Sequence, residues 1–166
     1  MQSRINYKLI DVKWQKYWEE NNIFHSEPDD KPVFSMILPP PNCTGIAHIG
    51  HALNSTLSDI LCRYKRMMGF NVCWVPGIDH AGIATQTKIE QELKKNGIDK
   101  NNLTKEEFIK HIWDWKDKYG NIIVNQLKKL GISCDWKREY FTLNKEFSEH
   151  VINTFVKLYK DGLIYQ

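Results

Sequence analysis

Apolar residues recur at helical spacing in two stretches of the first half of the chain, residues 7–22 and 47–68. The first stretch is rich in tryptophan and tyrosine, which predicts a helix with one aromatic face. The second stretch is followed by Gly69, a residue typical of the position just beyond a helix. The apolar positions of this second helix are Ile49, Leu53, Leu57, Ile60, Leu61, Tyr64 and Met67.

Two short apolar runs, residues 33–38 and 71–76, have the length and the β-forming residues of buried strands. Pro39 ends the first of them. A third helix opens within the sequence GIDHAGIA and runs to Gly97. The order strand, helix, strand, helix predicts parallel strands joined by right-handed crossovers, which is an α/β fold.

The second half of the chain predicts two more helices. Thr104 and Glu107 form a capping-box pattern before a long helix, and Asn144 caps the last one. Between these helices, residues 131–144 are expected to form an irregular or extended link, and residues 163–166 begin another extended segment. A parallel sheet of two or three strands leaves its helices short of packing surface, so we expect the N-terminal part of something larger.

The composition is that of a globular protein, with 42% hydrophobic and 26% charged residues. The net charge of +3 permits an anionic partner but does not require one, because nucleic-acid modules usually carry a stronger basic patch. The chain has no apolar run of about 18 residues and no signal-peptide core, so we expect a cytoplasmic protein without a membrane segment. Location in an organelle stays open, because a targeting segment that is cleaved off would not be part of this sequence.

Four cysteines, Cys43, Cys62, Cys73 and Cys134, show no paired spacing and have no histidine at zinc-finger distance. Neither a disulfide framework nor a structural zinc is therefore expected. Reduced thiols are the simpler interpretation.

The candidate chemistry begins in PPPNCTGIAHIGH, residues 39–51, directly after the first predicted strand. In open α/β sheets, ligands bind beyond the carboxyl ends of the strands and beside helix N-termini. Consecutive prolines form a stiff wall of carbonyl groups, and Asn42 adds an adaptable polar group. Gly45 allows the chain to turn, and Gly50 leaves room for a flat group to approach the backbone.

His48 and His51 lie three positions apart, on one face at the start of the second helix. The positive end of the helix dipole favours an anion and disfavours imidazolium, so we expect two neutral rings that donate hydrogen bonds to phosphate. Such donors stabilise the charge of a phosphoryl or nucleotidyl transfer without acting as a base. Simple packing or capping is the alternative, and a metal site is weakly supported without an acidic partner.

A second loop, PGIDHAG, follows the next predicted strand at residues 76–82. A carboxylate at Asp79 would face the same crevice and would suit a cation such as the α-ammonium of an amino acid. Alternatively, Asp79 caps the helix that begins near Ala81. From spacing alone, the chain is a nucleotide-binding α/β unit.

Residues 48–51 spell HIGH, the signature of the class I aminoacyl-tRNA synthetases. The surrounding PPPNCTGIAHIGHALNSTLSDILCRYKRMMGFNVCWVPGIDHAGIATQ resembles the valyl-tRNA synthetase family. The segments GISCDWKREYFTLN and FVKLYKDGLIYQ, and the first helix with Trp14 and Trp18, are also similar to that family. PPPN…TG together with DHAGIATQ separates it from the isoleucyl and leucyl families, which would show a WDxHGLP-like loop.

The resemblance implies the N-terminal half of a class I Rossmann-like, HUP-type catalytic domain at residues 33–166. A helical extension and linker would precede it at residues 1–32. The family activates L-valine with Mg²⁺-bound ATP and transfers it to tRNA(Val), which implies no protein-bound metal, no membrane and no DNA partner. No oligomer is predicted. The second signature KMSKS, the editing insertion and the anticodon-binding helices are not found in the sequence, so the chain alone is expected to be weakly active or inactive.

Carried over position by position, the resemblance assigns residues to three roles. The expected catalytic pair is His48 and His51. The expected ATP-binding residues are Thr44, His48, Gly50 and His51. The expected amino-acid-binding residues are Pro40, Pro41, Asn42 and Asp79. Cys43 and Ile78 differ from the residues that are usual in the family.

Three alternatives stay open at this point. The first is a fragment of an isoleucyl- or leucyl-type synthetase. The second is a non-catalytic nucleotide-binding or interaction fragment with the same fold. The third is a small stand-alone nucleotidyltransferase.

Overall fold

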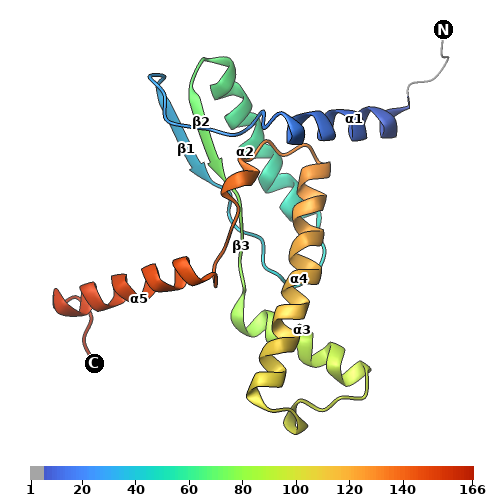
Figure 1. Ribbon diagram of the computed structural model, residues 1–166, viewed down its shortest axis with the longest axis vertical. Coiled ribbons are helices and arrows are strands. Elements are labelled where there is room, and N and C mark those ends of the chain that lie inside the picture. Colours follow the sequence, from blue (N-terminus) through green and yellow to red (C-terminus); the bar gives the residue numbers. More distant parts are fainter. Residues whose placement is uncertain (1–5) are drawn as a thin grey trace.

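A computed structural model describes residues 6–166, so the first five residues of the predicted N-terminal extension lie outside the described part. The helices and strands follow one another as shown in Figure 1. They are α1 (Tyr7–Glu20), β1 (Val33–Ile37), α2 (Ile49–Met67), β2 (Asn71–Val75), β3 (Gly77–Ile78), α3 (Gly82–Lys95), the 3₁₀ turn η1 (Lys100–Asn102), α4 (Lys105–Lys129), the 3₁₀ turn η2 (Trp136–Arg138), β4 (Tyr140–Phe141) and α5 (Lys145–Lys160).

The first two strands form the predicted parallel pair. β1 and β2 run side by side from Val33 opposite Asn71 to Ile37 opposite Val75, and α2 makes the crossover between them. Gly69 has a φ of 86°, a left-handed conformation that glycine adopts without strain, and it ends the helix as predicted. The α/β prediction is therefore confirmed.

The structure also contains a second, smaller parallel pair that the sequence did not predict. β3 pairs with β4, with Gly77 opposite Tyr140 and Ile78 opposite Phe141. β4 lies within the segment predicted to be an irregular or extended link, and β3 lies within the second predicted loop, residues 76–82. The further extended segment expected at residues 163–166 forms no strand, because α5 projects away from the body and leaves it no neighbour to pair with (Figure 1).

The main core lies between α2, the β1–β2 pair and the C-terminal half of α4. Its almost fully buried side chains come from α2, β2 and α4 and from the residues that follow β1 and α4: Leu38, Cys62, Val72, Trp74, Ile123, Leu127, Ile132 and Cys134. A smaller cluster of Cys43, Ile78 and Val124 continues along α4. The long helix α4 therefore packs against both the β1–β2 pair and β3.

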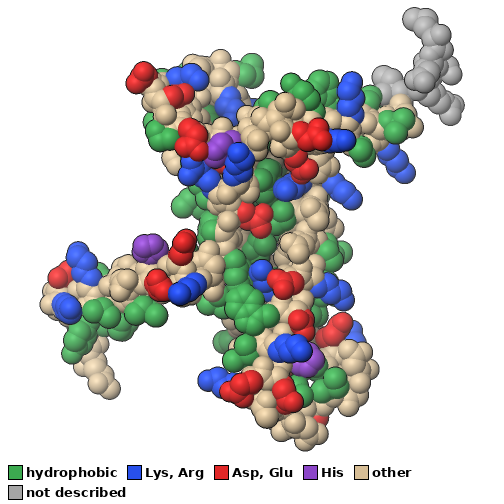
Figure 2. Space-filling model, viewed as in Figure 1, with side chains coloured by type: hydrophobic (Ala, Val, Ile, Leu, Met, Phe, Trp, Pro, Cys, Tyr) green, Lys and Arg blue, Asp and Glu red, His purple; other side chains and the backbone are tan. Residues whose placement is uncertain are grey.

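Much of the apolar pattern of α2 faces outward. The helix buries Ser55, Asp59 and Cys62, while its predicted apolar positions are between 48% and 87% exposed. α5 buries none of its residues, and Figure 2 shows hydrophobic side chains gathered along one side of it. These uncovered faces agree with the expected shortage of packing surface.

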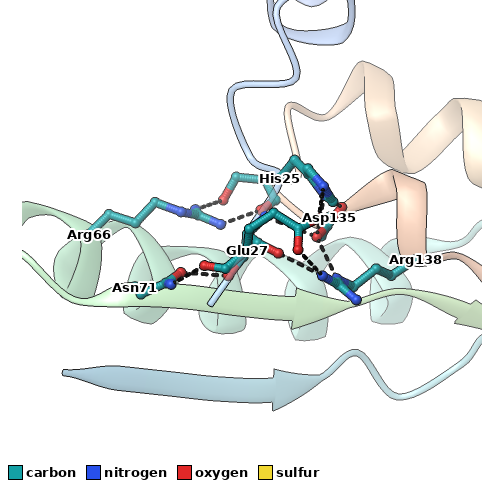
Figure 3. A network of polar contacts seen from close by, with 8 residues as sticks. His25, Glu27, Arg66, Asn71, Asp135 and Arg138 are labelled. Atoms are coloured by element: carbon teal, nitrogen blue, oxygen red, sulfur yellow. Dashed lines mark hydrogen bonds and ion pairs between the residues drawn. The ribbon is translucent and has the colours of Figure 1, made fainter. Parts of the chain in front are cut away.

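A polar network fastens the segment after α1 to the body of the protein (Figure 3). The Asp135 side chain is 1% exposed, and both of its oxygens lie 2.9 Å from Nδ1 of His25. Asp135 also accepts hydrogen bonds from the Ser26 amide (3.1 Å) and from Nε of Arg138 (3.1 Å). Burial alone would raise the pKa of Asp135, but these hydrogen bonds, led by that of His25, lower it below its ordinary value.

The β3–β4 pair requires a glycine at position 77. A Cβ at Gly77 would lie 2.4 Å from ring carbons of Tyr140, so the ring would have to move. We expect Gly77→Ala to lower the free energy of unfolding by about 1–3 kcal/mol, the usual cost of overpacking. Urea titration measures it. In a Tyr140→Ala background the same substitution should cost little, and an equal cost there would refute the clash.

Candidate functional site

The two predicted ligand loops are joined directly by their backbones. The Asp79 amide donates to the Pro41 carbonyl (2.9 Å), and the Cys43 amide donates to the Asp79 carbonyl (2.9 Å). Asn42 and Asp79 thus form an isolated parallel bridge just beyond the β1–β2 pair. Two residues predicted to contact the amino acid are therefore neighbours.

The proline wall is only partly available to a ligand. Pro41 is buried, Pro40 is half-buried, and Asn42 is exposed. Thr44 is half-buried and its amide donates to the Asn42 carbonyl at 2.8 Å, which closes a tight turn. The wall therefore presents Pro40 and Asn42 outward, while Pro41 anchors it.

Helix α4 holds this loop from behind through contacts that sequence reasoning missed. Nε1 of Trp115 donates to the Cys43 carbonyl (2.8 Å), and Oε1 of Gln126 accepts from the Ala47 amide (2.8 Å). Burial raises the pKa of the Cys43 thiol, so this cysteine packs as a neutral side chain. No signal in the sequence connects α4 with this loop, because the partners lie more than 70 residues apart.

His48 and His51 form a reciprocal cap at the start of α2. Nδ1 of His48 accepts from the Gly50 amide, and Nδ1 of His51 accepts from the His48 amide, both at 3.1 Å. The two rings stack with centroids 3.9 Å apart. The capping alternative raised from the sequence is therefore realised.

This cap also fixes the tautomer of both neutral rings. A backbone amide can only donate, so each Nδ1 must be unprotonated and each ring must carry its proton on Nε2. Burial, and then the neighbouring His48, lower the pKa of His51 below its ordinary value of 6.5. Capping and phosphate binding are thus compatible, because the cap uses Nδ1 and leaves Nε2–H as a donor.

A glycine at position 50 is needed for a reason other than the expected approach of a flat group to the backbone. A Cβ there would lie 3.0 Å from Cε1 and 3.1 Å from Nδ1 of His48. The space that the glycine leaves is therefore occupied by the His48 ring, so Gly50 allows the cap to form.

Asp79 is not the cap of α3. Ala81 occupies that position with a φ of 54°, and no side chain caps the helix. The Asp79 carboxylate is about one-third exposed and accepts a hydrogen bond from the Thr142 hydroxyl (3.2 Å). The capping alternative is therefore wrong, and the carboxylate keeps an open side.

The site therefore joins two different chemistries at the carboxyl end of a parallel strand pair. One part is a helix N-terminus with two neutral imidazole donors, which suits phosphate. The other is a partly exposed carboxylate, which suits a cation. Together they form the arrangement that we expect of an α/β protein that binds a nucleotide.

Comparison with known proteins gives the family. The model for class I tRNA synthetases (I, L, M and V) matches residues 13–166, and the chain belongs to this family. It is 57% identical over 157 residues to the valine–tRNA ligase of Carboxydothermus hydrogenoformans, covering 95% of this chain and 18% of that protein. It is 52% identical to the valine–tRNA ligase of Christiangramia forsetii, covering 99% of this chain and 19% of that protein.

A solved structure agrees with the fold. The chain superposes with a TM-score of 0.76 and 26% identity on the crystal structure of the ternary complex of Agrobacterium radiobacter K84 agnB2 LeuRS-tRNA-LeuAMS, covering 98% of this chain and 19% of that one. The predicted family and fold class are confirmed, and the relatives do not favour the isoleucyl or leucyl alternative. The chain spans less than one-fifth of the length of these relatives.

Residues 6–166 contain neither a helix that could span a membrane nor a cluster of metal ligands. None of the helices in this part of the chain has the length and apolar character that a membrane span requires. The same residues contain no group of three or more histidine, cysteine, aspartate or glutamate side chains placed to hold a metal ion.

Proposed function

We propose that this chain is the part of a valyl-tRNA synthetase that binds ATP and L-valine for the formation of valyl-adenylate. The observation that carries the proposal is the reciprocal cap of His48 and His51, which leaves two Nε2–H donors at the N-terminus of α2. Valine–tRNA ligases that are 50% or more identical over nearly the whole chain support the choice of amino acid.

In the proposed reaction, a carboxylate oxygen of valine attacks the α-phosphorus of Mg²⁺-bound ATP. The new oxygen–phosphorus bond forms as the bond to the bridging oxygen breaks, and pyrophosphate leaves with the electron pair. The attacking carboxylate is already ionised, so no general base is needed. His48 and His51 stabilise the growing phosphate charge, and Gly50 and Thr44 lie beside the nucleotide.

On the amino-acid side, Asp79 binds the ammonium group of valine. Pro40, Pro41 and Asn42 border its side chain, with Pro41 acting as the anchor of the wall. An apolar pocket of this kind discriminates weakly against threonine, which has the same shape. Rejection of threonine would therefore be a task for other parts of the whole enzyme.

The remaining assignments follow from the same proposal. Residues 1–32 form an N-terminal extension, and residues 33–166 form the first half of the catalytic domain of a cytoplasmic enzyme. The whole protein would pass the valyl group to tRNA(Val). A non-catalytic nucleotide-binding fragment is the second candidate, and the one-third exposure of the Asp79 side chain is compatible with both.

Exchange of labelled pyrophosphate into ATP tests the proposal. We would replace the matching segment of the Carboxydothermus hydrogenoformans valine–tRNA ligase by residues 1–166 and supply valine, isoleucine or leucine. The chimaera should exchange with valine at a rate within about tenfold of the parent enzyme. A preference for isoleucine or leucine would contradict the amino-acid assignment, and a folded but inactive chimaera would favour the non-catalytic candidate.

Asp79→Asn should separate valine binding from ATP binding. The amide keeps the shape of the side chain but loses its charge, so we expect the KM for valine to rise about 10- to 100-fold. The KM for ATP should change less than about threefold. Asp99→Asn, at the cap of η1, is the matched control and should change neither. An unchanged KM for valine in Asp79→Asn would remove Asp79 from the site.

A further inference from the structure

The Thr142 hydroxyl is the central atom of a small polar cluster beside Asp79. It lies 3.2 Å from Oδ1 of Asp79, 2.9 Å from the His80 amide nitrogen and 2.6 Å from Nδ1 of the His80 ring. Nδ1 of His80 is in turn 3.4 Å from Oδ1 of Asp79. Three groups thus converge on one hydroxyl.

The β3–β4 pairing places this hydroxyl beside Asp79. Thr142 follows β4 directly, and its amide donates to the Ile78 carbonyl at 3.1 Å, which continues the register of the pair. Asp79 follows β3 in the same way. The two side chains therefore meet because two parallel strands end together.

The protons in this cluster can be assigned by counting hydrogen-bond donors and acceptors. A threonine hydroxyl has one proton to donate and two lone pairs with which to accept. The Asp79 carboxylate can only accept and the His80 amide can only donate, so the single hydroxyl proton goes to Asp79. The remaining contact requires His80 to donate from Nδ1, which leaves Nε2 of the neutral ring as an acceptor.

We propose that Thr142 is a positioning residue: it fixes the orientation of the Asp79 carboxylate and holds His80 as the Nδ1–H tautomer. Its importance for valine rests on the proposed function of Asp79. The site then contains histidines of opposite kinds, with Nε2–H donors at His48 and His51 and an Nε2 acceptor at His80. The donors serve phosphate, and the acceptor lies on the side of the amino acid.

Nitrogen NMR of the chain tests the tautomer without any catalytic assay. In the ¹⁵N-labelled protein at pH 8, we expect His80 to show a protonated Nδ1 and an unprotonated Nε2, and His48 and His51 to show the reverse. Thr142→Val removes the hydroxyl at nearly constant shape and should release His80 to a mixture of tautomers. Thr142→Ser keeps the hydroxyl and should retain the wild-type pattern. An Nε2–H His80 in the wild type, or an unchanged His80 in Thr142→Val, would overturn the proposal.

Kinetics of the chimaera test the consequence for valine. Thr142→Val should raise the KM for valine about tenfold, while kcat and the KM for ATP stay within about twofold, and Thr142→Ser should restore the wild-type value. Thr87→Val, which removes a hydroxyl bonded only to the Ile83 carbonyl of α3, is the matched control. Equal loss in kcat, the KM for ATP and the KM for valine would indicate a purely structural role and overturn the positioning role.

The two readouts separate this inference from the proposed function. If the wild-type chimaera shows no valine-dependent exchange, the proposed function fails, while the tautomer of His80 still decides the role of Thr142. If exchange occurs and Thr142→Val leaves the KM for valine unchanged, the proposed function stands and this inference fails.

Discussion

The His48→Asn, His51→Asn double variant is expected to lose at least about 10³-fold in valine-dependent pyrophosphate exchange by the chimaera. Removal of one preorganised donor to a developing negative charge typically costs about 10²–10³-fold, and paired donors are rarely additive. Asparagine is the informative replacement because its Oδ1 stands where Nδ1 of histidine stands. The cap that starts α2 is therefore preserved, and the donor at Nε2 is removed.

The control for this variant is His150→Asn on the exposed surface of α5, which should leave exchange unchanged. Circular dichroism of both variants should match the wild type, because the cap is retained. Exchange by the double variant within about tenfold of wild type, in a folded protein, would mean that the histidines only cap the helix.

Asp135→Ala is expected to cause a large loss of stability. The substitution removes the acceptor of hydrogen bonds from His25, Ser26 and Arg138, so it releases the segment after α1 (Figure 3). We expect the free energy of unfolding to fall by about 2–4 kcal/mol. This lies below the full cost of breaking a buried pair, because the Arg138 side chain is 39% exposed and can be rehydrated.

Urea titration measures this loss, with Asp161→Ala as the control. Asp161 forms an exposed pair with Lys157 at 3.6 Å, which should contribute less than about 1 kcal/mol. A loss at Asp135 that is no greater than the loss at Asp161 would contradict a structural role for the network.

The same network makes the free energy of unfolding depend on pH. The pKa of Asp135 is lower in the folded protein, so its contribution is present above the pKa of the unfolded chain and is lost as the pH falls through the folded pKa. The difference in stability between wild type and Asp135→Asn should therefore shrink below about pH 4.

Local signals in the sequence predicted the helix starts well. Thr104 and Asn144 cap α4 and α5 as expected, because a cap depends on residues within one turn. The β3–β4 pair was not predictable in the same way. A two-residue strand has no measurable alternation, and its partner lies more than 60 residues away.

Periodicity predicted that α2 is a helix but not which face is covered. Its inward face carries Asp59, which accepts from the Ser133 amide at 2.8 Å and pairs with Arg63. The regular apolar face lies outside. Hydrophobic periodicity indicates that one face of a helix is apolar, whereas the burial of that face depends on what packs beside the helix.

The sequence proposes residues for the candidate site, but it does not show the contacts that hold them in place. The sequence identified His48, His51 and Asp79, and left capping open for each. Capping proved right for the histidines and wrong for Asp79, since that choice depends on backbone geometry around Ala81. The contacts of Trp115 and Gln126 with the loop could not be predicted without the fold, because α4 and the loop are far apart in the sequence.

We propose that the loops at residues 40–51 and 77–80 form one site with a phosphate side and an ammonium side. Titration of the ¹⁵N-labelled chain with a non-hydrolysable sulfamoyl analogue of valyl-adenylate tests it most directly. We predict saturable shifts of the amides of Asn42, Thr44, Gly50, Asp79 and His80 with a single binding constant. Shifts confined to one of the two loops, or centred elsewhere on the chain, would contradict it.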